Sequence, residues 1–593
     1  MSTSNNNKNV GESISDWGLM IEPPLILDDP DTHEWTTQAD MVVVGLGGAG
    51  VASALAGLEA GLSVVAVDRF DGGGSSAANG GVFYAGGGTS VQSEAGVEDD
   101  PQRMFDYLKQ ETGDIVSDET LRDFCESSAP TVDWLRDHGV PFQGSLYSKK
   151  ASYPPLDKFL YHSDSSLSAP FRNLTPPAAR GHRVYGRNGR KAWGLGGFLW
   201  EPLRDAALRL GLDFRRHAEA QQLALDRSGR VVGVRIARIA DAQRSQSFSA
   251  LIAKAGKWMA ILPPSFPGAR LTQAVGYRAL LKARAVEAQA RQTEWIRARH
   301  GVVLSGGGFI LNSRMVRHFA PKYAAGLPNG TLGDNGSGIM LGVSAGGATS
   351  LMERVSAWRF LSPPRAWGQA MLVNGRGARF VNETWYGARI GDEMVEYNGG
   401  RSWIILDARL RRQALKDAFG PGVLSFQRDI TLINTLFGAI RAEDPAALAR
   451  KLGFDEGTFL ATLQDYNRAA AGACVDPFHK SADEMAVLDK GPWYAIDASV
   501  DSALFPLSCM TVGGLVVDET NGGVKRSDGT PIEGLYAAGR NAVGLCSHLY
   551  VSGLSYADCI WSGRRAARSI ARESCRQQSL AASEKTGEEQ LSF

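Results

Sequence analysis

The segment from residue 41 to residue 68 constrains the fold of this chain more than any other, because strand-like and helix-like stretches alternate around a glycine-rich turn. A β-branched run at 41–44 meets the sequence Gly-Leu-Gly-Gly-Ala-Gly at 45–50, and an Ala/Leu-rich stretch continues to Gly61. A second β-branched run then ends at Asp68. This punctuation predicts a βαβ unit buried on both faces in a parallel sheet, rather than a helix that spans a membrane.

The glycine spacing in this unit is typical of a turn that binds a dinucleotide. Gly45 permits the tight turn, Gly47 allows the backbone to approach a pyrophosphate, and Gly50 allows the helix to pack closely on the strand. The phosphates would lie at the helix N-terminus, where free N–H groups and the helix dipole attract negative charge. Asp68 would accept hydrogen bonds from the ribose hydroxyls. The alternative is a glycine-rich turn that binds no ligand.

Three further elements are rich in glycine, in a chain with 69 glycines among 593 residues against an average usage of about 7%. The stretch 71–81 is expected to lack regular structure, and its many backbone N–H groups suit a second phosphate contact or a flavin ring. The runs 302–309 and 534–540 each predict a strand followed by a tight turn. A helix that begins near Leu554 or Ser555 would direct its positive end at a bound group.

Charge and cysteine content exclude several classes of protein. The 63 Lys and Arg residues balance the 63 Asp and Glu residues, so the chain lacks the basic surplus of a nucleic-acid binder. The six cysteines include no Cys-x-x-Cys pair, which predicts a reduced chain without a structural metal site. The first residues are polar and show no signal-peptide pattern, so a cytoplasmic location is expected.

An ordered set of motifs carries a resemblance to a known family. The motifs are VVVGLGGAG at 42–50, the Gly/Ser loop at 72–81, VVLSGGGF at 302–309, RFVNE at 379–383, TVGGL at 511–515, GLYAAGR at 534–540 and SGRRAA at 562–567. Over residues 38–575 the chain resembles the fumarate reductase/succinate dehydrogenase flavoprotein family and, within it, the bacterial 3-ketosteroid dehydrogenases. The resemblance implies a flavin cofactor, FAD, and an oxidoreductase that acts on a CH–CH bond.

The family fold implied by this resemblance is α/β. A Rossmann-like FAD-binding domain is built from both chain ends, at 38–320 and 491–575, with an inserted α+β catalytic domain at 321–490. An N-terminal arm at 1–37 and a flexible tail at 576–593 complete the expected division. Residues 493–495 are expected to be the strand on which the chain returns to the FAD-binding domain. No histidine lies between His33 and His138, so FAD is expected to bind without a covalent link through a histidine of the 71–81 loop.

Departures from the family pattern indicate the kind of substrate. Fumarate reductases hold a dicarboxylate with an arginine at the position of Tyr550 and a histidine at the position of Cys509-Met510. A dianion without these partners would be costly to bury, so a neutral substrate is expected. The sequence Tyr550-Val-Ser552-Gly553 is similar to the Tyr-x-Ser element of the 3-ketosteroid Δ4-dehydrogenases, whereas the Δ1-dehydrogenases carry Tyr-Pro-Gly there. Tyr386 matches the tyrosine that this subfamily contributes from its catalytic domain.

These matches imply roles for four residues in forming the C4–C5 double bond of a 3-ketosteroid. The hydroxyl of Tyr550 and the backbone N–H of Leu554 would hydrogen-bond the 3-keto oxygen and stabilise the developing enolate. Ser552, linked to Tyr386, would remove the proton from C4 while hydride passes from C5 to flavin N5. An ordinary tyrosine pKa near 10 would give an alkaline optimum unless the site lowers it. The alternative is that both tyrosines are only packed aromatic side chains.

The motifs and the resemblance together predict the residues that contact the cofactor. They are Gly45, Gly47, Gly48, Ala49, Gly50, Asp68, Arg69, Ser75, Ser76, Asn79, Gly80, Gly81, Gly306, Gly307, Asp334, Gly539, Arg540, Gly553, Leu554 and Ser555.

An insertion at 242–298 has a strong charge bias. No acidic residue occurs between Asp241 and Glu287, while seven basic residues are interleaved with apolar ones. The basic residues are Arg244, Lys254, Lys257, Arg270, Arg278, Lys282 and Arg284, and the apolar ones include Leu251, Ile252, Trp258, Met259, Ile261, Leu262 and Phe266, around Pro263, Pro264 and Pro267. This composition favours peripheral contact of 242–286 with the inner face of an anionic membrane. Ordinary surface helices or a homodimer contact are the alternatives.

Three other functions remain open at the level of the sequence. A Δ1-dehydrogenase of the same fold is disfavoured by Ser552-Gly553, and a fumarate-reductase-like reductase of an unsaturated carboxylate is disfavoured by Tyr550. A flavin-bearing membrane or redox-partner protein without turnover would suit the basic insertion. For the Δ4 reaction, the electron acceptor is expected to be a quinone or a redox protein.

Overall fold

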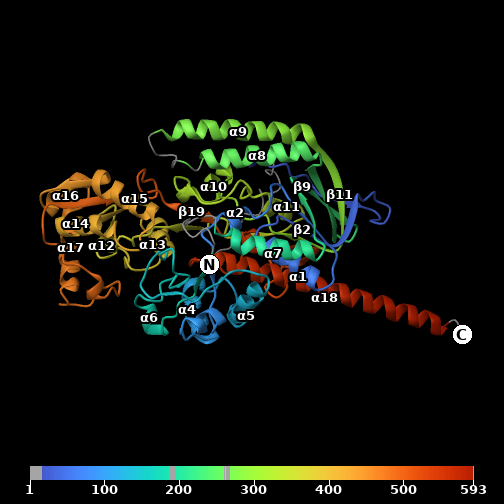
Figure 1. The fold of residues 1–593 in the computed structure, drawn as a ribbon, viewed down its shortest axis with the longest axis horizontal. Helices are drawn as coiled ribbons and strands as arrows, with labels where there is room; N and C mark the ends of the chain where they lie inside the picture. The colour runs from blue at the N-terminus through green and yellow to red at the C-terminus, as the bar shows by residue number, and fades with distance from the viewer. Residues whose placement is uncertain (1–16, 186–194, 260, 262–267, 592–593) are drawn as a thin grey trace.

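A mixed sheet at the centre of the molecule carries the dinucleotide-type unit on its parallel strands (Figure 1). The computed structural model describes residues 17–185, 195–259, 261 and 268–591; the predicted apolar residues Leu262 and Phe266 lie outside them, as do Pro263, Pro264 and Pro267. The main sheet contains β1 (Leu25–Leu27), β9 (Ala218–Asp226), β10 (Val231–Ile239), β11 (Arg291–Leu304), β2 (Thr37–Val44), β3 (Val64–Asp68) and β8 (Asp213–Arg216), in that order, with β22 (Pro531–Ala537) and β21 (Gly523–Lys525) joined through β11.

The predicted βαβ unit is confirmed. Strands β2 and β3 pair in parallel, with Met41 opposite Val64, and α1 (Gly48–Glu59) connects them. Strand β11 pairs with β2 and, over its last residues, with β22, both in parallel. Because β2 comes from the first part of the chain and β22 from the last, the sheet is assembled from both chain ends, as the family fold implies.

Two helices pack closely on this sheet through small residues. Helix α18 (Leu554–Leu591) lies against α1, and the hydroxyl of Ser53 donates to the carbonyl of Gly563 at 2.9 Å. A Cβ at Gly563 would lie 2.4 Å from the carbonyl oxygen of Ala49, so the approach requires glycine. Helix α18 continues through the expected tail as far as Leu591, in agreement with a sequence rich in the strong helix formers Ala, Glu and Gln. That this segment is flexible stays a prediction.

A separate four-stranded sheet forms the core of the middle region. Its order is β15 (Met371–Asn374), β16 (Ser402–Leu406), β18 (Trp493–Asp497) and β17 (Ala439–Ala442), all antiparallel. Figure 1 shows helices around it at the left: α12 (Arg365–Gly368), α14 (Ala408–Asp417), α15 (Ser425–Ile433), α16 (Pro445–Leu452) and α17 (Glu456–Ala470). The expectation that 493–495 returns to the FAD-binding sheet is therefore wrong. Its apolar residues pair instead with β16 and β17, and the chain rejoins the main sheet at β21 and β22.

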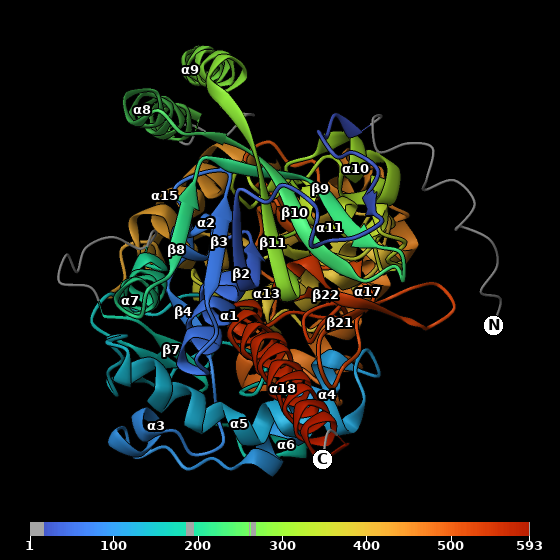
Figure 2. The same cartoon turned by 90° about the vertical axis from the view of Figure 1, so that its right-hand side faces the viewer.

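Three other expected segments differ in detail. The stretch 71–81 is not wholly irregular, because α2 (Gly74–Ala78) forms within it. The insertion is a hairpin of α8 (Ala242–Met259) and α9 (Ala269–Ala290), and its predicted last residues, 291–298, belong to β11. Part of the N-terminal arm is ordered, because β1 pairs with β9. Figure 2 shows the hairpin projecting from the body beyond β10 and β11.

Further helices surround these sheets. They include α4 (Pro101–Thr112), α5 (Asp118–Asp137), α7 (Gly197–Arg209) and α11 (Ser337–Ser344). Within the residues that the structure describes, no helix combines the length and the apolar character needed to cross a membrane.

Candidate active site

The glycine-rich turns meet at the carboxyl edge of the parallel strands, the edge at which such sheets bind ligands. The turn after β2 touches the turn after β11: a Cβ at Gly45 would lie 2.8 Å from the carbonyl oxygen of Ser305 and from Cα of Gly306. Gly45 also has φ +92°, in the left-handed region. A side chain at this position is therefore excluded twice, by backbone conformation and by contact.

The other two glycines of the motif differ in what surrounds them. A Cβ at Gly50 would lie 2.0 Å from the carbonyl oxygen of Gly45, so the helix packs directly on the turn. At Gly47 the nearest atom to such a Cβ is the Ser76 hydroxyl oxygen at 3.8 Å. Space beside Gly47 and contact at Gly50 are what a pyrophosphate turn requires.

Asp68 and Arg69, at the end of β3, have partners within the protein. The Asp68 carboxylate accepts hydrogen bonds from the N–H groups of Leu46 and Phe70, both at 2.8 Å, and burial raises its pKa. The guanidinium of Arg69 pairs with Glu219 at 2.8 Å and with Glu287 at 3.0 Å. Asp68 thus orders the glycine turn itself, while Arg69 is held by two carboxylates. Their contacts to a cofactor remain predictions.

Asp334 joins three of the predicted cofactor elements. Its carboxylate pairs with Arg540 at 2.6 Å, accepts from the hydroxyl of Ser75, and accepts from the N–H of Thr331 at 2.9 Å. A Cβ at Gly307 would lie 2.8 Å from the same carboxylate. The loop 71–81, the turn after β11 and the turn after β22 are consequently fixed around one buried side chain.

Several predicted cofactor residues of the 71–81 loop and of α18 also make internal contacts. The N–H of Gly48 donates to Ser76 at 3.0 Å, and Asn79 accepts from the N–H of Gly81 at 2.8 Å. Ala49 is buried in the first turn of α1, and Ser555 is half-buried in the first turn of α18. The carbonyl of Gly80 accepts a hydrogen bond from the hydroxyl of Tyr153, and Gly539 lies in a turn with φ +61°.

Unpartnered buried atoms beside these turns test whether a cofactor would fit. Within the described residues, both polar atoms of the Asn541 side chain and Nη1 of Arg540 have no hydrogen-bond partner. Asn541 is fully buried, and a Cβ at Gly306 would lie 3.5 Å from its Oδ1. A bound group with its own donors and acceptors would satisfy these atoms, so the residues fit a dinucleotide. The sequence analysis missed Asn541, although it directly follows the GLYAAGR motif.

Ser552 lies at the centre of the predicted catalytic residues. The hydroxyl of Tyr161, in β6 (Leu160–Tyr161), donates to Oγ of Ser552 at 3.3 Å. The aromatic rings of Tyr386 and Tyr550 are 6.4 Å apart, and a hydrogen bond with Ser552 affects the pKa of Tyr386. The structure thus brings Tyr386, Tyr550 and Ser552 together, as expected, and adds Tyr161, which the sequence analysis missed.

Burial changes the predicted proton chemistry. It raises the pKa of Tyr386 well above 10, and the neighbouring tyrosines Tyr550 and Tyr161 raise it further against the opposing hydrogen bond with Ser552. Burial also raises the pKa of Tyr550 and of Tyr161. The site therefore does not lower the pKa of Tyr386. All three phenols are therefore neutral donors at ordinary pH.

The donors expected to bind the keto oxygen are arranged differently from the prediction. The N–H of Gly553 donates to the Tyr550 hydroxyl oxygen at 3.2 Å, which leaves the Tyr550 proton available to a ligand. The N–H of Leu554 donates to the carbonyl of Val551 at 3.1 Å. Tyr550 is thus prepared as a donor. For Leu554 to play its predicted role, its N–H must either be shared between the Val551 carbonyl and the keto oxygen or leave the Val551 carbonyl.

A buried polar loop after β6 positions the catalytic residues. Its members His162, Ser163, Asp164, Ser165, Ser166 and Ser168 are all at most 8% exposed. Ser163 clamps Ser552 on both sides, accepting from its N–H and donating to its carbonyl, each at 3.1 Å. Ser165 accepts from the N–H of Tyr386 at 2.9 Å. The sequence analysis missed this loop.

Aromatic rings form a wall beside these hydroxyls. Trp358, at the end of β14 (Val355–Trp358), lies 5.4 Å from the ring of Tyr550, and Phe360 lies 5.5 Å from the ring of Tyr386. Such a surface offers apolar contact and few charges, which suits a flat, neutral ligand.

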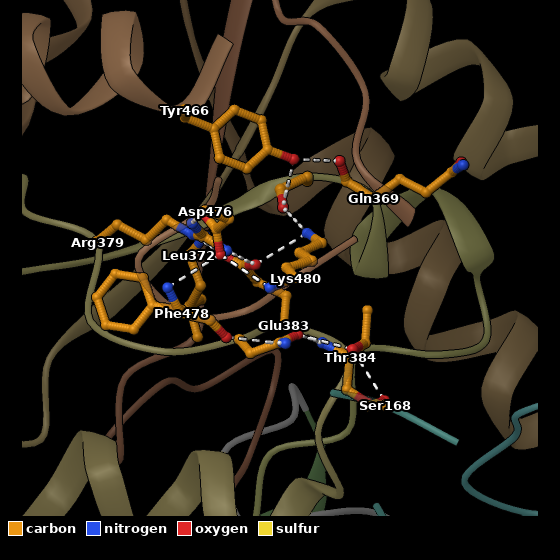
Figure 3. Close-up of polar contacts among 12 residues, drawn as sticks. Ser168, Gln369, Leu372, Arg379, Glu383, Thr384, Tyr466, Asp476, Phe478 and Lys480 are labelled. Atoms are coloured by element: carbon orange, nitrogen blue, oxygen red, sulfur yellow. Dashed lines mark hydrogen bonds and ion pairs between the residues drawn. The ribbon is translucent and has the colours of Figure 1, made fainter. Parts of the chain in front are cut away.

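A buried ionic cluster holds Glu383, three residues before Tyr386 in the chain; Figure 3 shows its members. The carboxylate of Glu383 accepts from Nε of Arg379 at 2.7 Å and from Nζ of Lys480 at 2.8 Å, and Arg379 also pairs with Asp476. Burial acts to raise the pKa of Glu383, but the two cations prevail and lower it to about 2. The cluster fixes the RFVNE segment that leads into Tyr386.

Asp558, on the first turns of α18, provides a prediction about stability. It is 5% exposed, its Oδ1 has no partner among the described residues, and burial raises its pKa from 3.8 to about 6. The neutral carboxyl of Asp558 therefore contributes stability that is complete below pH 3.8 and is lost as pH rises through 6, where the buried carboxylate forms. We expect Asp558→Asn to stabilise the holoenzyme by about 2 kcal/mol at pH 7.5 and by little at pH 4. Urea unfolding at both values measures this, with exposed Asp465→Asn as the control; an equal effect at both pH values would contradict it.

Comparisons with known proteins agree with this geometry. Residues 40–553 match the family described as FAD binding domain. A 3-oxo-5-alpha-steroid 4-dehydrogenase of Comamonas testosteroni is 34% identical over 87% of this chain and 95% of its own length. The crystal structure of a 3-ketosteroid-delta4-(5alpha)-dehydrogenase from Rhodococcus jostii RHA1 is 28% identical, with a TM-score of 0.76 over 93% of this chain and all of that chain. A 3-ketosteroid delta1-dehydrogenase from Sterolibacterium denitrificans shares the fold, with a TM-score of 0.61 at 20% identity over 91% of this chain and all of its own.

Proposed function

This chain belongs to the fumarate reductase/succinate dehydrogenase flavoprotein family and to its 3-ketosteroid dehydrogenase branch, and on that premise we propose that it introduces the C4–C5 double bond of a 3-ketosteroid. Its cofactor is FAD. The observation that carries the proposal is that the hydroxyls of Tyr161 and Tyr386 meet at Ser552, with the ring of Tyr550 beside that of Tyr386 and an aromatic wall next to them. This arrangement can bind and polarise a ketone without a charged group that would call for a carboxylate substrate.

The residues would divide the reaction between a donor and a base. Tyr550 donates its proton to the 3-keto oxygen and so increases the acidity of the C4 hydrogen. Ser552 relays the C4 proton: its Oγ takes that proton while its own hydroxyl proton passes to the phenolate form of Tyr386, and Tyr161 donates a hydrogen bond to the same Oγ. Because burial raises the pKa of Tyr386, this phenolate is scarce at ordinary pH and the reaction should become faster as pH rises. Bound FAD supplies the oxidant that takes the hydrogen of C5 as hydride. The elements around Gly45, Asp334, Arg540 and Asn541 would hold it without a covalent bond.

The electron acceptor, location and assembly complete the proposal. Each turnover leaves two electrons on the protein's cofactor, so a quinone or a redox protein must remove them. We propose a cytoplasmic location, which the six free cysteines support, and a homodimer as the assembly.

An anaerobic assay tests the reaction. Purified yellow holoenzyme is mixed with a saturated 3-ketosteroid or with its 4-ene, with and without an artificial acceptor. We expect only the saturated ketone to bleach the flavin and to yield the 4-ene. Bleaching by the 4-ene alone would replace this proposal by the Δ1 reaction, and bleaching by neither would reject steroid dehydrogenation.

A further inference from the structure

The α8–α9 hairpin is a rigid projection rather than a loose excursion. Its helices touch closely, because a Cβ at Gly276 would lie 2.5 Å from Cγ of Met259. At its base, the ring of Phe248 stacks on Phe70 at 6.2 Å, and Glu287 binds Arg69. Figures 1 and 2 show both helices lying side by side, outside the main sheet. The body of the protein therefore fixes which side of the hairpin faces outward.

The side of α9 turned away from α8 is amphipathic; we name it the outer face. Tyr277 and Leu281, one turn apart, are 53% and 45% exposed. The exposed residues Ala274, Ala285 and Ala288 continue the same row at helical spacing. Nearer the turn between the helices, Leu271 is 77% exposed. An apolar row thus runs along the outer face of α9, which the described part of the chain leaves exposed.

Cations flank this row, and acids are kept away from it. Arg278 and Lys282 lie on one side and Arg284 on the other, all exposed. Among the described residues, none of the seven basic side chains between 242 and 286 has a carboxylate partner within 4.0 Å. The first acid after Asp241 is Glu287, which points into the body and pairs with Arg69 and Arg291.

We propose that the outer face binds the surface of a membrane that contains anionic phospholipid. Apolar side chains can enter the headgroup boundary, while the flanking cations extend toward lipid phosphates along their aliphatic stems. A protein partner would need many shaped contacts, but this row offers only two large side chains, Tyr277 and Leu281, between exposed alanines. The advantage of membrane binding rests on the proposed function: because a steroid dissolves in lipid, an enzyme bound to the membrane would receive its substrate there.

Vesicle flotation of the holoenzyme tests this proposal. Vesicles of phosphatidylcholine alone are compared with vesicles that also contain phosphatidylglycerol, at low and high salt. We expect binding only to the anionic vesicles, weakened by salt. The variant R278Q/K282Q/R284Q should bind about 100-fold more weakly, at about fivefold per charge, and Y277S/L281S should also lose binding at low salt. The control R376Q/R412Q/K416Q removes three exposed charges of the catalytic region and should bind like the wild type.

The readouts separate this inference from the proposed function. Flotation requires no steroid, and the soluble steroid assay of the outer-face variants should equal that of the wild type. Failure of the holoenzyme to float with anionic vesicles, or equal loss in the control variant, would overturn the proposal. If the outer-face variants instead shift the sedimentation of the free protein from dimer to monomer while vesicles remain unbound, the face is a subunit contact and the membrane proposal is rejected.

Discussion

Replacing Tyr550 by phenylalanine is expected to lower kcat for a saturated 3-ketosteroid by about 100- to 1,000-fold, the usual cost of one donor to a developing oxyanion. Phenylalanine keeps the ring contact with Trp358 but removes the proton offered to the keto oxygen. It also deprives the N–H of Gly553 of its acceptor. Because the charge on oxygen develops in the transition state, kcat should fall much more than KM changes. Stopped-flow bleaching of the flavin measures the step directly.

Two matched variants sharpen this result. Tyr323→Phe removes a buried hydroxyl that donates to Glu396 at 2.7 Å, far along the chain from the catalytic residues, and should leave turnover unchanged. Ser552→Ala should reduce the rate as strongly as Tyr550→Phe, because the relay that carries the C4 proton to Tyr386 is lost. Turnover of Tyr550→Phe within a few-fold of the wild type, with normal flavin content, would show that Tyr550 is only a packed aromatic residue.

Local pattern explains what could be predicted from the sequence. The turn at Gly45 and the helix that begins at Leu554 depend on neighbouring residues and on backbone conformation, and both appear where expected. The fold of the dinucleotide-type sheet follows from the same signals, since parallel strands with a short crossover leave few arrangements. Tyr550 and Ser552 were identified through a short motif whose residues are adjacent in the chain.

Contacts between distant segments explain what could not be predicted. Tyr161 and Ser552 are 391 residues apart, and neither Tyr161 nor the serine loop after it belongs to a recognisable motif. The run 493–495 has the apolar character of a buried strand, but that character does not specify which sheet the strand joins. The run pairs with β16 rather than with the FAD-binding strands. The raised pKa of Tyr386 likewise depends on burial among residues from three parts of the chain.

The second large effect concerns stability and the cluster in Figure 3. Glu383→Gln should destabilise the holoenzyme by about 3–5 kcal/mol at pH 7, because Arg379 and Lys480 would be left buried without their shared carboxylate. Exposed Glu456→Gln, which breaks a surface pair with Arg450, should cost under about 1 kcal/mol. Urea unfolding followed by tryptophan fluorescence compares the two variants. Equal, small losses in both would show that the buried cluster adds no stability.

The dependence on pH and on Lys480 distinguishes a charge effect from a packing defect. The pKa of Glu383 is lowered from 4.5 to about 2, so the stability that it contributes is complete above pH 4.5 and is lost as pH falls toward 2. The difference in the free energy of unfolding between wild type and Glu383→Gln should therefore become smaller only below pH 4.5. Adding Lys480→Met to Glu383→Gln should recover part of the loss, because one uncompensated cation disappears. A loss that is constant with pH and unrelieved by Lys480→Met would identify the effect as steric.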